Sequence, residues 1–327
     1  HCISQWGHDF RPSYLRLGEV LDRVKPSRVI ACTATATPIV RREIQARLGL
    51  DSDRSAVILR GFSRPNLHLA VVESDSSADR RSRMLGALQH ALGKPASPRG
   101  GAIVYAATRR NTEKIAASVS KAGWRAEAYH AGLPAARRSE VQERFLRDEL
   151  RVVVATVAFG MGIDKPNVRF VVHYDLPKHI EGYYQETGRA GRDGLPSEAL
   201  LLFGAQDIVT ARRLIDTSGN PEQRRIEVHK LNAMVGLAES VTCRRRVLLN
   251  YFGERLEQDC GNCDVCLDPP ERFDATEAAQ AKQIVQELGL QSEAFEWYQV
   301  SKAVGNVKNT GAALIGHLDS KEPPDRL

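Results

Sequence analysis

The sequence predicts an α/β protein in which a parallel sheet with helices on both faces is followed by a helical, cysteine-containing module. Between residues 67 and 203, short apolar runs alternate with stretches of helical pattern. Such alternation is typical of parallel strands joined by right-handed crossover helices. After Gly204 the apolar runs stop, and four of the six cysteines follow between residues 243 and 266.

Length and composition place the chain among globular proteins. Its 327 residues suffice for two or three domains, each with its own core. No run of about eighteen apolar residues is present, so we expect no membrane span. We also find no charged-then-apolar leader, which favours a cytoplasmic protein. The net charge of +6 is a weak indication of a polyanionic partner.

Residues 1–12 predict an exposed loop, because Gly7 and Pro12 break regular structure. Flat rings beside an arginine suit stacking against unpaired bases. The alternative is an aromatic plug packed on a neighbouring domain. The candidate side chains of this loop are Trp6, His8, Phe10 and Arg11.

The rest of the N-terminal region predicts two strands and a helix. The apolar runs at residues 28–32 and 57–59 indicate buried strands, and Cys2 and Cys32 are interpreted as small core residues. Thr37 before Pro38 predicts a helix start, and Gly49 its end. Residues 60–66 predict a break, where we place a domain boundary.

The middle of the chain predicts four buried strands, at residues 103–106, 152–155, 170–172 and 199–203. Helical patterns lie between them, at residues 109–121, 134–150 and 180–187. Ligands of parallel sheets gather at the carboxyl ends of the strands. We therefore expect contacts from residues 108–110, 156–165 and 175–177.

Residues 183–194 read Tyr-Tyr-Gln-Glu-Thr-Gly-Arg-Ala-Gly-Arg-Asp-Gly and place Arg189 and Arg192 three positions apart among glycines. Helical spacing of three puts both side chains on one face. A guanidinium group can form two hydrogen bonds with phosphate oxygens, and an arginine can reach across an interface to do so. A solvated basic turn is the alternative.

Residues 156–166 follow a buried strand. Thr156 and two glycines, Gly160 and Gly162, allow backbone N–H groups to face a phosphate, to which Lys165 adds charge. Asp164 is placed to accept a hydrogen bond from a ribose hydroxyl. The alternative is an ordinary strand-to-helix turn. The chain contains no Gly-x4-Gly-Lys-[Ser/Thr] phosphate-binding loop.

The four clustered cysteines predict a structural zinc site with no position open for catalysis. An iron–sulfur cluster is the main alternative. The first ligand lies on a helix predicted over residues 221–252, and Arg244, Arg245 and Arg246 beside it form either a solvated face or a phosphate contact. A shorter helix is predicted at residues 206–216, with weaker ones at 275–288 and 298–318. The four candidate ligands are Cys243, Cys260, Cys263 and Cys266.

Taken together, these segments resemble the RecQ family of DNA helicases, bacterial type, over residues 1 to 275. Residues 1–12 are similar to the last residue of the Walker B box (DEAH) and the family's aromatic-rich loop, and residues 33–37 to motif III. Residues 129–133, 152–177 and 183–194 resemble motifs of the second RecA-like lobe. The four cysteines match the zinc ligands, and the tail resembles the start of a winged helix.

The resemblance implies four parts. They are the end of a first RecA-like lobe (1–61), a second lobe (62–203), a zinc-binding domain (204–273) and a partial winged helix (274–327). It implies an ATP-dependent 3′-to-5′ DNA helicase of recombination and repair. In that interpretation, with ATP and Mg²⁺ as cofactors, Arg189 and Arg192 reach the γ-phosphate, and Gln185 helps to link the nucleotide to the position of the lobe. The backbone of the segment that begins at Thr156, together with Lys165, holds the DNA phosphates. Trp6, Phe10 and Arg11 couple single-stranded DNA to hydrolysis through His1 and residues 33–37.

Some features of the family pattern are missing from these 327 residues. They are the phosphate-binding loop, the Asp-Glu before His1 and the rest of the winged helix. We therefore expect the chain to begin in mid-domain and to be inactive alone. The expected partners are single-stranded and partly duplex DNA and a single-strand-binding protein, for a nucleoid-associated monomer. The competing hypotheses are a non-catalytic DNA-binding or strand-annealing module and a DEAD-box RNA helicase.

Overall fold

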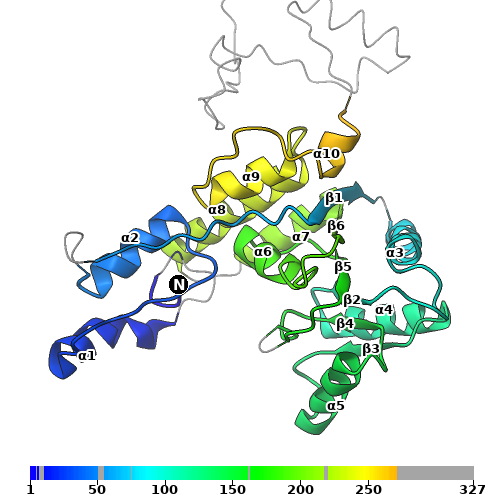
Figure 1. Ribbon diagram of the computed structural model, residues 1–327, viewed down its shortest axis with the longest axis horizontal. Helices are drawn as coiled ribbons and strands as arrows, with labels where there is room; N and C mark the ends of the chain where they lie inside the picture. The colour runs from blue at the N-terminus through cyan, green and yellow to red at the C-terminus, as the bar shows by residue number, and fades with distance from the viewer. Residues whose placement is uncertain are drawn as a thin grey trace, which may run out of the picture. The chain divides into compact units, whose positions relative to one another are not determined.

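The computed structural model describes residues 1–4, 6, 11–50, 55–74, 76–160, 163–216 and 220–270 (Figure 1). Residues His1–Pro270 form one compact unit. The predicted weak helices at 275–288 and 298–318, and with them the partial winged helix, lie outside the described residues. The boundaries predicted inside the unit, at 61/62 and 203/204, stay predictions.

The centre of the unit is a six-stranded, wholly parallel sheet with the strand order β1-β6-β5-β2-β4-β3. The first strand in the sequence is therefore an edge strand, paired with the last strand from Leu67 opposite Ser197 to Glu73 opposite Phe203. The strands are β1 (Leu67–Glu73), β2 (Gly101–Tyr105), β3 (Ala126–Tyr129), β4 (Val152–Ala155), β5 (Val168–His173) and β6 (Ser197–Phe203).

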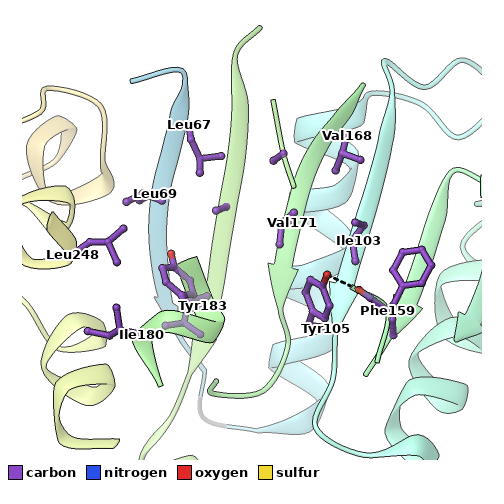
Figure 2. Close-up of a cluster of buried hydrophobic side chains, with 14 of the residues drawn as sticks. Leu67, Leu69, Ile103, Tyr105, Phe159, Val168, Val171, Ile180, Tyr183 and Leu248 are labelled. Carbon is purple, nitrogen blue, oxygen red and sulfur yellow. Dashed lines mark hydrogen bonds between the residues drawn. The ribbon is translucent and has the colours of Figure 1, made fainter. Parts of the chain in front are cut away.

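Alternate residues of each strand point to opposite faces, and each face has its own core. One face packs on α3 (Ser77–Leu92) and α4 (Arg109–Lys121) through side chains such as Met84 and Val119. The other packs on α5 (Ala135–Leu146), α6 (Ile180–Thr187) and helices of the cysteine module that follows the sheet. Figure 2 shows Leu67 and Leu69 of β1 beside Ile180 and Tyr183 of α6, with Leu248 of the cysteine module next to them.

The predicted alternation of strands and helices is confirmed, and α4, α6 and β4 have the predicted bounds. Thr108 caps α4, because its side chain accepts a hydrogen bond from the N–H of Asn111. Several elements had no predicted residue range, among them the edge strands β1 and β3 and the long helix α3. The short sequence Ala-Glu-Ala-Tyr of β3 offers no apolar run to recognise.

The N-terminal region contains a 3-10 turn (Pro12–Arg16), α1 (Leu17–Val24) and α2 (Pro38–Arg47). Thr37 caps α2 as predicted, accepting from the N–H of Val40, and Gly49 follows with φ 61°. The two strands predicted here are wrong. Residues 28–32 and 57–59 pair with no strand among the described residues and are exposed, with Ile58 79% accessible. Cys32 is likewise exposed and Cys2 half-buried, so the prediction that both are core residues is wrong.

The cysteine module follows β6 and contains α7 (Ala205–Asp216), α8 (Pro221–Ala238), α9 (Arg244–Tyr251) and the single turn α10 (Asp264–Leu267). One helix was predicted over residues 221–252, but residues 239–243 interrupt it. There the Ser240 hydroxyl bonds to the backbone of Thr242, and Cys243 becomes the N-cap residue of the next helix. No described helix has the length and apolar character needed to cross a membrane.

Candidate metal centre and arginine loop

The four clustered cysteines converge as predicted. Their sulfur atoms all lie within 4.8 Å of one another, and those of Cys260 and Cys266 are 3.9 Å apart. Cys243 precedes α9, Cys263 precedes α10, and both are buried. Backbone N–H groups of Cys260 and Asn262 point at the sulfurs of Cys243 and Cys260, at 3.3 and 3.4 Å.

This spacing fits one tetrahedral metal ion. Zinc–sulfur bonds of about 2.3 Å place four thiolates about 3.8 Å from each other. In an iron–sulfur cluster the thiolates are divided among several irons, which spreads the sulfurs more widely. Burial and the three neighbouring thiols raise the pKa of the Cys266 thiol, and a bound cation would favour its thiolate form. The donor set and geometry therefore support structural zinc.

The metal centre is fastened to the edge of the sheet. Cys263 forms a parallel bridge with Leu69 of β1, and the Val71 N–H donates to the Asp264 carboxylate at 2.8 Å. Arg244 donates from Nε to both oxygens of Asp264, at 2.6 and 2.8 Å. Its Nη1 donates to two carbonyls at the end of α8. The module and β1 thus share one network of hydrogen bonds.

Two of the three arginines after Cys243, Arg244 and Arg245, do not form the solvated face or phosphate contact that sequence pattern suggested. Arg244 and Arg245 are 8% and 4% exposed and donate to backbone and carboxylate groups inside the unit. Arg246 is more exposed and pairs with Asp259 at 3.0 Å. The sequence could not show this for Arg245, because its carbonyl partners lie 178 and 181 residues away.

The segment from Arg189 to Gly194, here called the arginine loop, follows α6. Arg192 Nη1 lies 2.8 Å from Asp164 Oδ1 and 3.2 Å from the Ile163 carbonyl. Arg189 lies against Gly160, where an added Cβ would come within 2.8 Å of its Nη2. Arg192 and Asp164 are therefore brought together as candidate site residues, with Arg189 beside the end of the 156–160 turn. Gly162 lies outside the described residues.

Arg189 is also close to a buried tyrosine that sequence analysis did not single out. Tyr105, the last residue of β2, donates from its hydroxyl to the Phe159 carbonyl at 3.0 Å (Figure 2). Burial raises the pKa of Tyr105, and the nearby Arg189 guanidinium opposes that rise. The Nε of Arg189 is buried without a hydrogen-bond partner among the described residues.

A buried His–Glu pair lies next to this tyrosine. His173, the last residue of β5, is 2.8 Å from Glu186 of α6, and its ring stacks on Tyr105 with centroids 5.4 Å apart. The carboxyl ends of neighbouring strands place them together, which was the signal available in the sequence. The pair joins β5 to the helix that leads into the arginine loop.

Helix α6 also contacts the N-terminal region. Gln185 Nε2 donates to the hydroxyl of Thr35 at 3.1 Å, and Thr35 is 1% exposed. Thr33, two residues earlier, lies 3.0 Å from Nδ1 of His1. The segment that carries Gln185 and the arginines therefore bonds directly to residues 33–35, and these in turn contact His1.

The remaining candidates are placed separately. Trp6 packs edge-to-face on His229 of α8, with centroids 5.7 Å apart, and beside a small core around Val40. This is the packing that the aromatic-plug alternative described. Arg11 is exposed beside the Tyr14 ring, and Thr156 is half-buried after β4. His8 and Phe10 lie outside the described residues.

Lys165 lies inside the lobe, not at a surface open to phosphate. Its side chain is 3% exposed, and its Nζ is 2.8 Å from Asp148 Oδ1 and 5.3 Å from the centre of the Phe145 ring. The expectation of a DNA-phosphate contact did not allow for this carboxylate, which is seventeen residues away in the sequence.

Known domain families match two stretches of the chain. The helicase conserved C-terminal domain matches residues 83–194, which include most of the sheet and the whole arginine loop. The RecQ zinc-binding domain matches residues 205–267, which include all four cysteines. Together with the geometry, this supports zinc as the structural metal.

The chain is also similar in sequence to curated RecQ helicases. The ATP-dependent DNA helicase RecQ of Pasteurella multocida is 47% identical over 86% of this chain and 43% of its own length. That of Bacillus subtilis is 42% identical over 98% of this chain and 52% of its own length. This chain spans about half the length of these curated relatives.

Among solved structures, a variant of S. cerevisiae Dbp5 bound to RNA and ADP BeF3 superposes with a TM-score of 0.51. It is 17% identical and covers 86% of this chain and 60% of that one, a likeness of fold alone. The α/β fold class predicted from the sequence is confirmed. From the two domain families and the similar proteins, the chain belongs to the RecQ family, as its motifs indicated.

Proposed function

We propose that this chain supplies the second motor lobe and the zinc module of an ATP-dependent 3′-to-5′ DNA helicase used in recombination and repair. The names of its relatives support the class of activity. The observation that carries the proposal is the hydrogen bond between Gln185 and Thr35. It joins the helix before the arginine loop to the N-terminal region. Coupling between two lobes requires such a direct contact.

In this proposal Arg189 and Arg192 stabilise the charge that develops on the transferred γ-phosphoryl group, beside Mg²⁺. Arg192 pairs with Asp164, whose side chain is 83% exposed. An ion pair this exposed is worth only about 0–1 kcal/mol, so a phosphate can replace the carboxylate at little cost. Asp164 is then free to accept a hydrogen bond from a ribose hydroxyl.

Coupling to DNA follows the same contacts. Movement of the lobes with each hydrolysis would shift Gln185 against Thr35 and, through Thr33, against His1. Trp6 and Arg11 remain the proposed DNA-sensing side chains of the N-terminal loop. The proposed substrates are single-stranded and partly duplex DNA, bound with an affinity that falls as salt rises. Zinc has a structural role only.

The test is Arg192→Ala in a version that also carries a phosphate-binding loop, with Arg83→Ala as the matched control. Arg83 is a surface residue of α3 paired with Asp79. Removing an arginine that contacts the transferred phosphoryl group should lower DNA-stimulated ATP turnover by about 10³-fold or more. The affinity for single-stranded DNA should stay within a factor of about two of the control. Equal loss of turnover and DNA binding would contradict the arginine assignment.

ATP hydrolysis by these 327 residues alone is not part of the proposal, because they contain no phosphate-binding loop. We expect DNA binding without turnover from the chain as it stands, measured with Mg²⁺ and single-stranded DNA. A non-catalytic DNA-binding or strand-annealing module is the alternative. It would be favoured if the version with a phosphate-binding loop bound DNA and annealed strands but hydrolysed no ATP.

A further inference from the structure

The segment between the N-terminal region and β1 lies against the arginine loop. Arg64 of this segment donates from Nη1 to the Gly188 carbonyl at 3.3 Å. Its Nη2 donates to the carbonyls of Ala190 and Gly191, at 2.8 and 2.9 Å. These three carbonyls lie on both sides of Arg189 and directly before Arg192. One rigid guanidinium thus fixes the backbone from which both arginines project.

Asn66 holds the second half of the loop. Its Nδ2 donates to the carbonyls of Gly191 and Leu195, at 2.9 and 3.0 Å, and its own carbonyl accepts from the Ser197 N–H. Gly191 has a φ of 60°, and a Cβ there would lie 2.5 Å from Asn66 Nδ2. The side chain of Asn66 therefore spans the base of the loop at a position where only glycine fits.

The segment that contains Arg64 and Asn66 also contacts the cysteine module. Arg245 donates to the carbonyls of Arg64 and Leu67, and Asn262 donates from Nδ2 to the Pro65 carbonyl at 2.9 Å. Arg245 is two residues after the ligand Cys243, and Asn262 directly precedes the ligand Cys263. Residues 64–66 thus form hydrogen bonds with residues next to the metal-centre cysteines on one side and with the arginine loop on the other.

We infer that Arg64 and Asn66 are positioning residues for the arginine loop, and that the zinc site holds them in place. The loop contains or adjoins Gly188, Gly191 and Gly194, which allow many backbone conformations when nothing restrains them. The side chains of both positioning residues donate to backbone carbonyls of residues 188–195, so each acts through Arg189 and Arg192. The expected effect on ATP turnover rests on the proposed function. The restraint of the arginine loop by Arg64 and Asn66 does not depend on that function.

The structural part is tested on this chain by hydrogen–deuterium exchange. Arg64→Ala and Asn66→Ala should each speed exchange at least tenfold in peptides covering residues 188–197. In that region the Gly191 N–H bonds to the Val168 carbonyl and the Gly194 N–H to that of Gly191. Peptides from β4 should be unchanged, and Arg83→Ala should match the wild type throughout. Unchanged exchange in residues 188–197 would overturn the inference.

The link to the metal is tested with Asn262→Ala, which leaves all four cysteines in place. It should speed exchange in the same peptides without lowering the zinc content of the chain. Removal of zinc with a chelator should do so more strongly. If neither treatment changes exchange at residues 188–197, the zinc site does not hold the positioning residues and that part of the inference is wrong.

The functional part is tested in the version that carries a phosphate-binding loop. Arg64→Ala should lower the kcat of DNA-stimulated ATP hydrolysis by about 10- to 100-fold and change the KM for ATP much less, because misplaced groups lose contacts made in the transition state. If Arg192→Ala abolishes turnover and Arg64→Ala leaves kcat unchanged, the inference is overturned and the proposed function stands. If Arg192→Ala has no effect, the proposed function fails and the exchange data alone decide the inference.

Discussion

Replacing Lys165 by methionine tests whether a charge in the lobe core stabilises the fold or contacts DNA. Removing one member of a buried ion pair costs about 3–5 kcal/mol. Here the partner Asp148 is 36% exposed and keeps Arg151 at 2.8 Å. Solvent screening therefore reduces the expected loss in the free energy of unfolding to about 1–2 kcal/mol. Methionine preserves the packing of the aliphatic stem on Phe145.

The pH dependence of this loss has a defined sign. Burial favours a higher pKa for Asp148, but Lys165, Arg151 and Asn167 outweigh it, so the pKa is lowered overall. A carboxyl group with a lowered pKa in the folded state stabilises the fold above its unfolded pKa of about 3.9. That stabilisation disappears as the pH falls through the folded pKa. The difference between wild type and Lys165→Met should therefore be full at neutral pH and shrink below about pH 4.

The assay is urea unfolding of the chain from pH 3 to pH 7, together with DNA affinity at several salt concentrations. Lys121→Met, an exposed lysine of α4, is the matched control. We expect Lys165→Met to lower stability and to leave the DNA affinity and its salt dependence equal to those of the control. Unchanged stability with a weaker, less salt-dependent DNA affinity would refute the ion-pair reasoning and return Lys165 to the DNA surface.

Three further outcomes follow from the described contacts. Cys263→Ser should lower the zinc content measured by atomic emission and destabilise the chain by more than about 3 kcal/mol, whereas the exposed Cys32→Ser should change neither. Gly191→Ala should cost about 1–3 kcal/mol in chemical denaturation, because φ is 60° and the new Cβ meets Asn66; a neutral result would show that the loop relaxes freely. Gln185→Ala should reduce DNA-stimulated ATP turnover about 2- to 10-fold, because one neutral hydrogen bond to Thr35 is lost. Unchanged turnover would show that this bond does not couple DNA binding to ATP hydrolysis.

The parts of the fold that the sequence predicted are those with local signals. Strand β4 is an unbroken run of buried apolar residues, and helix α4 begins at a threonine cap and is followed by Gly123 with φ 92°. The zinc site was predictable because four cysteines at short spacing have few other uses in such a protein. Each of these signals lies within one short stretch of chain.

The errors have the opposite character, because they depend on partners far away in the sequence. Residues 28–32 and 57–59 have strand-like composition, but a strand forms only beside another strand, and none of the described strands pairs with these segments. Lys165 and Arg245 read as surface charges until their partners are known, and Arg245 contacts a carbonyl 181 residues away. The arginine pair was predicted from spacing, whereas its support by Arg64 could come only from the structure.

The position of β1 at the edge of the sheet has a consequence for aggregation. An edge strand exposes unpaired N–H and C=O groups that can pair with the edge of another molecule. In this protein the bridge from Leu69 to Cys263 and the bond from the Val71 N–H to Asp264 cover that edge. The covering residues, Cys263 and Asp264, are held in position by the cysteine cluster, of which Cys263 is a member. Loss of the metal would therefore uncover an apolar, hydrogen-bonding edge, and chains without zinc should self-associate through β1 before their sheets unfold.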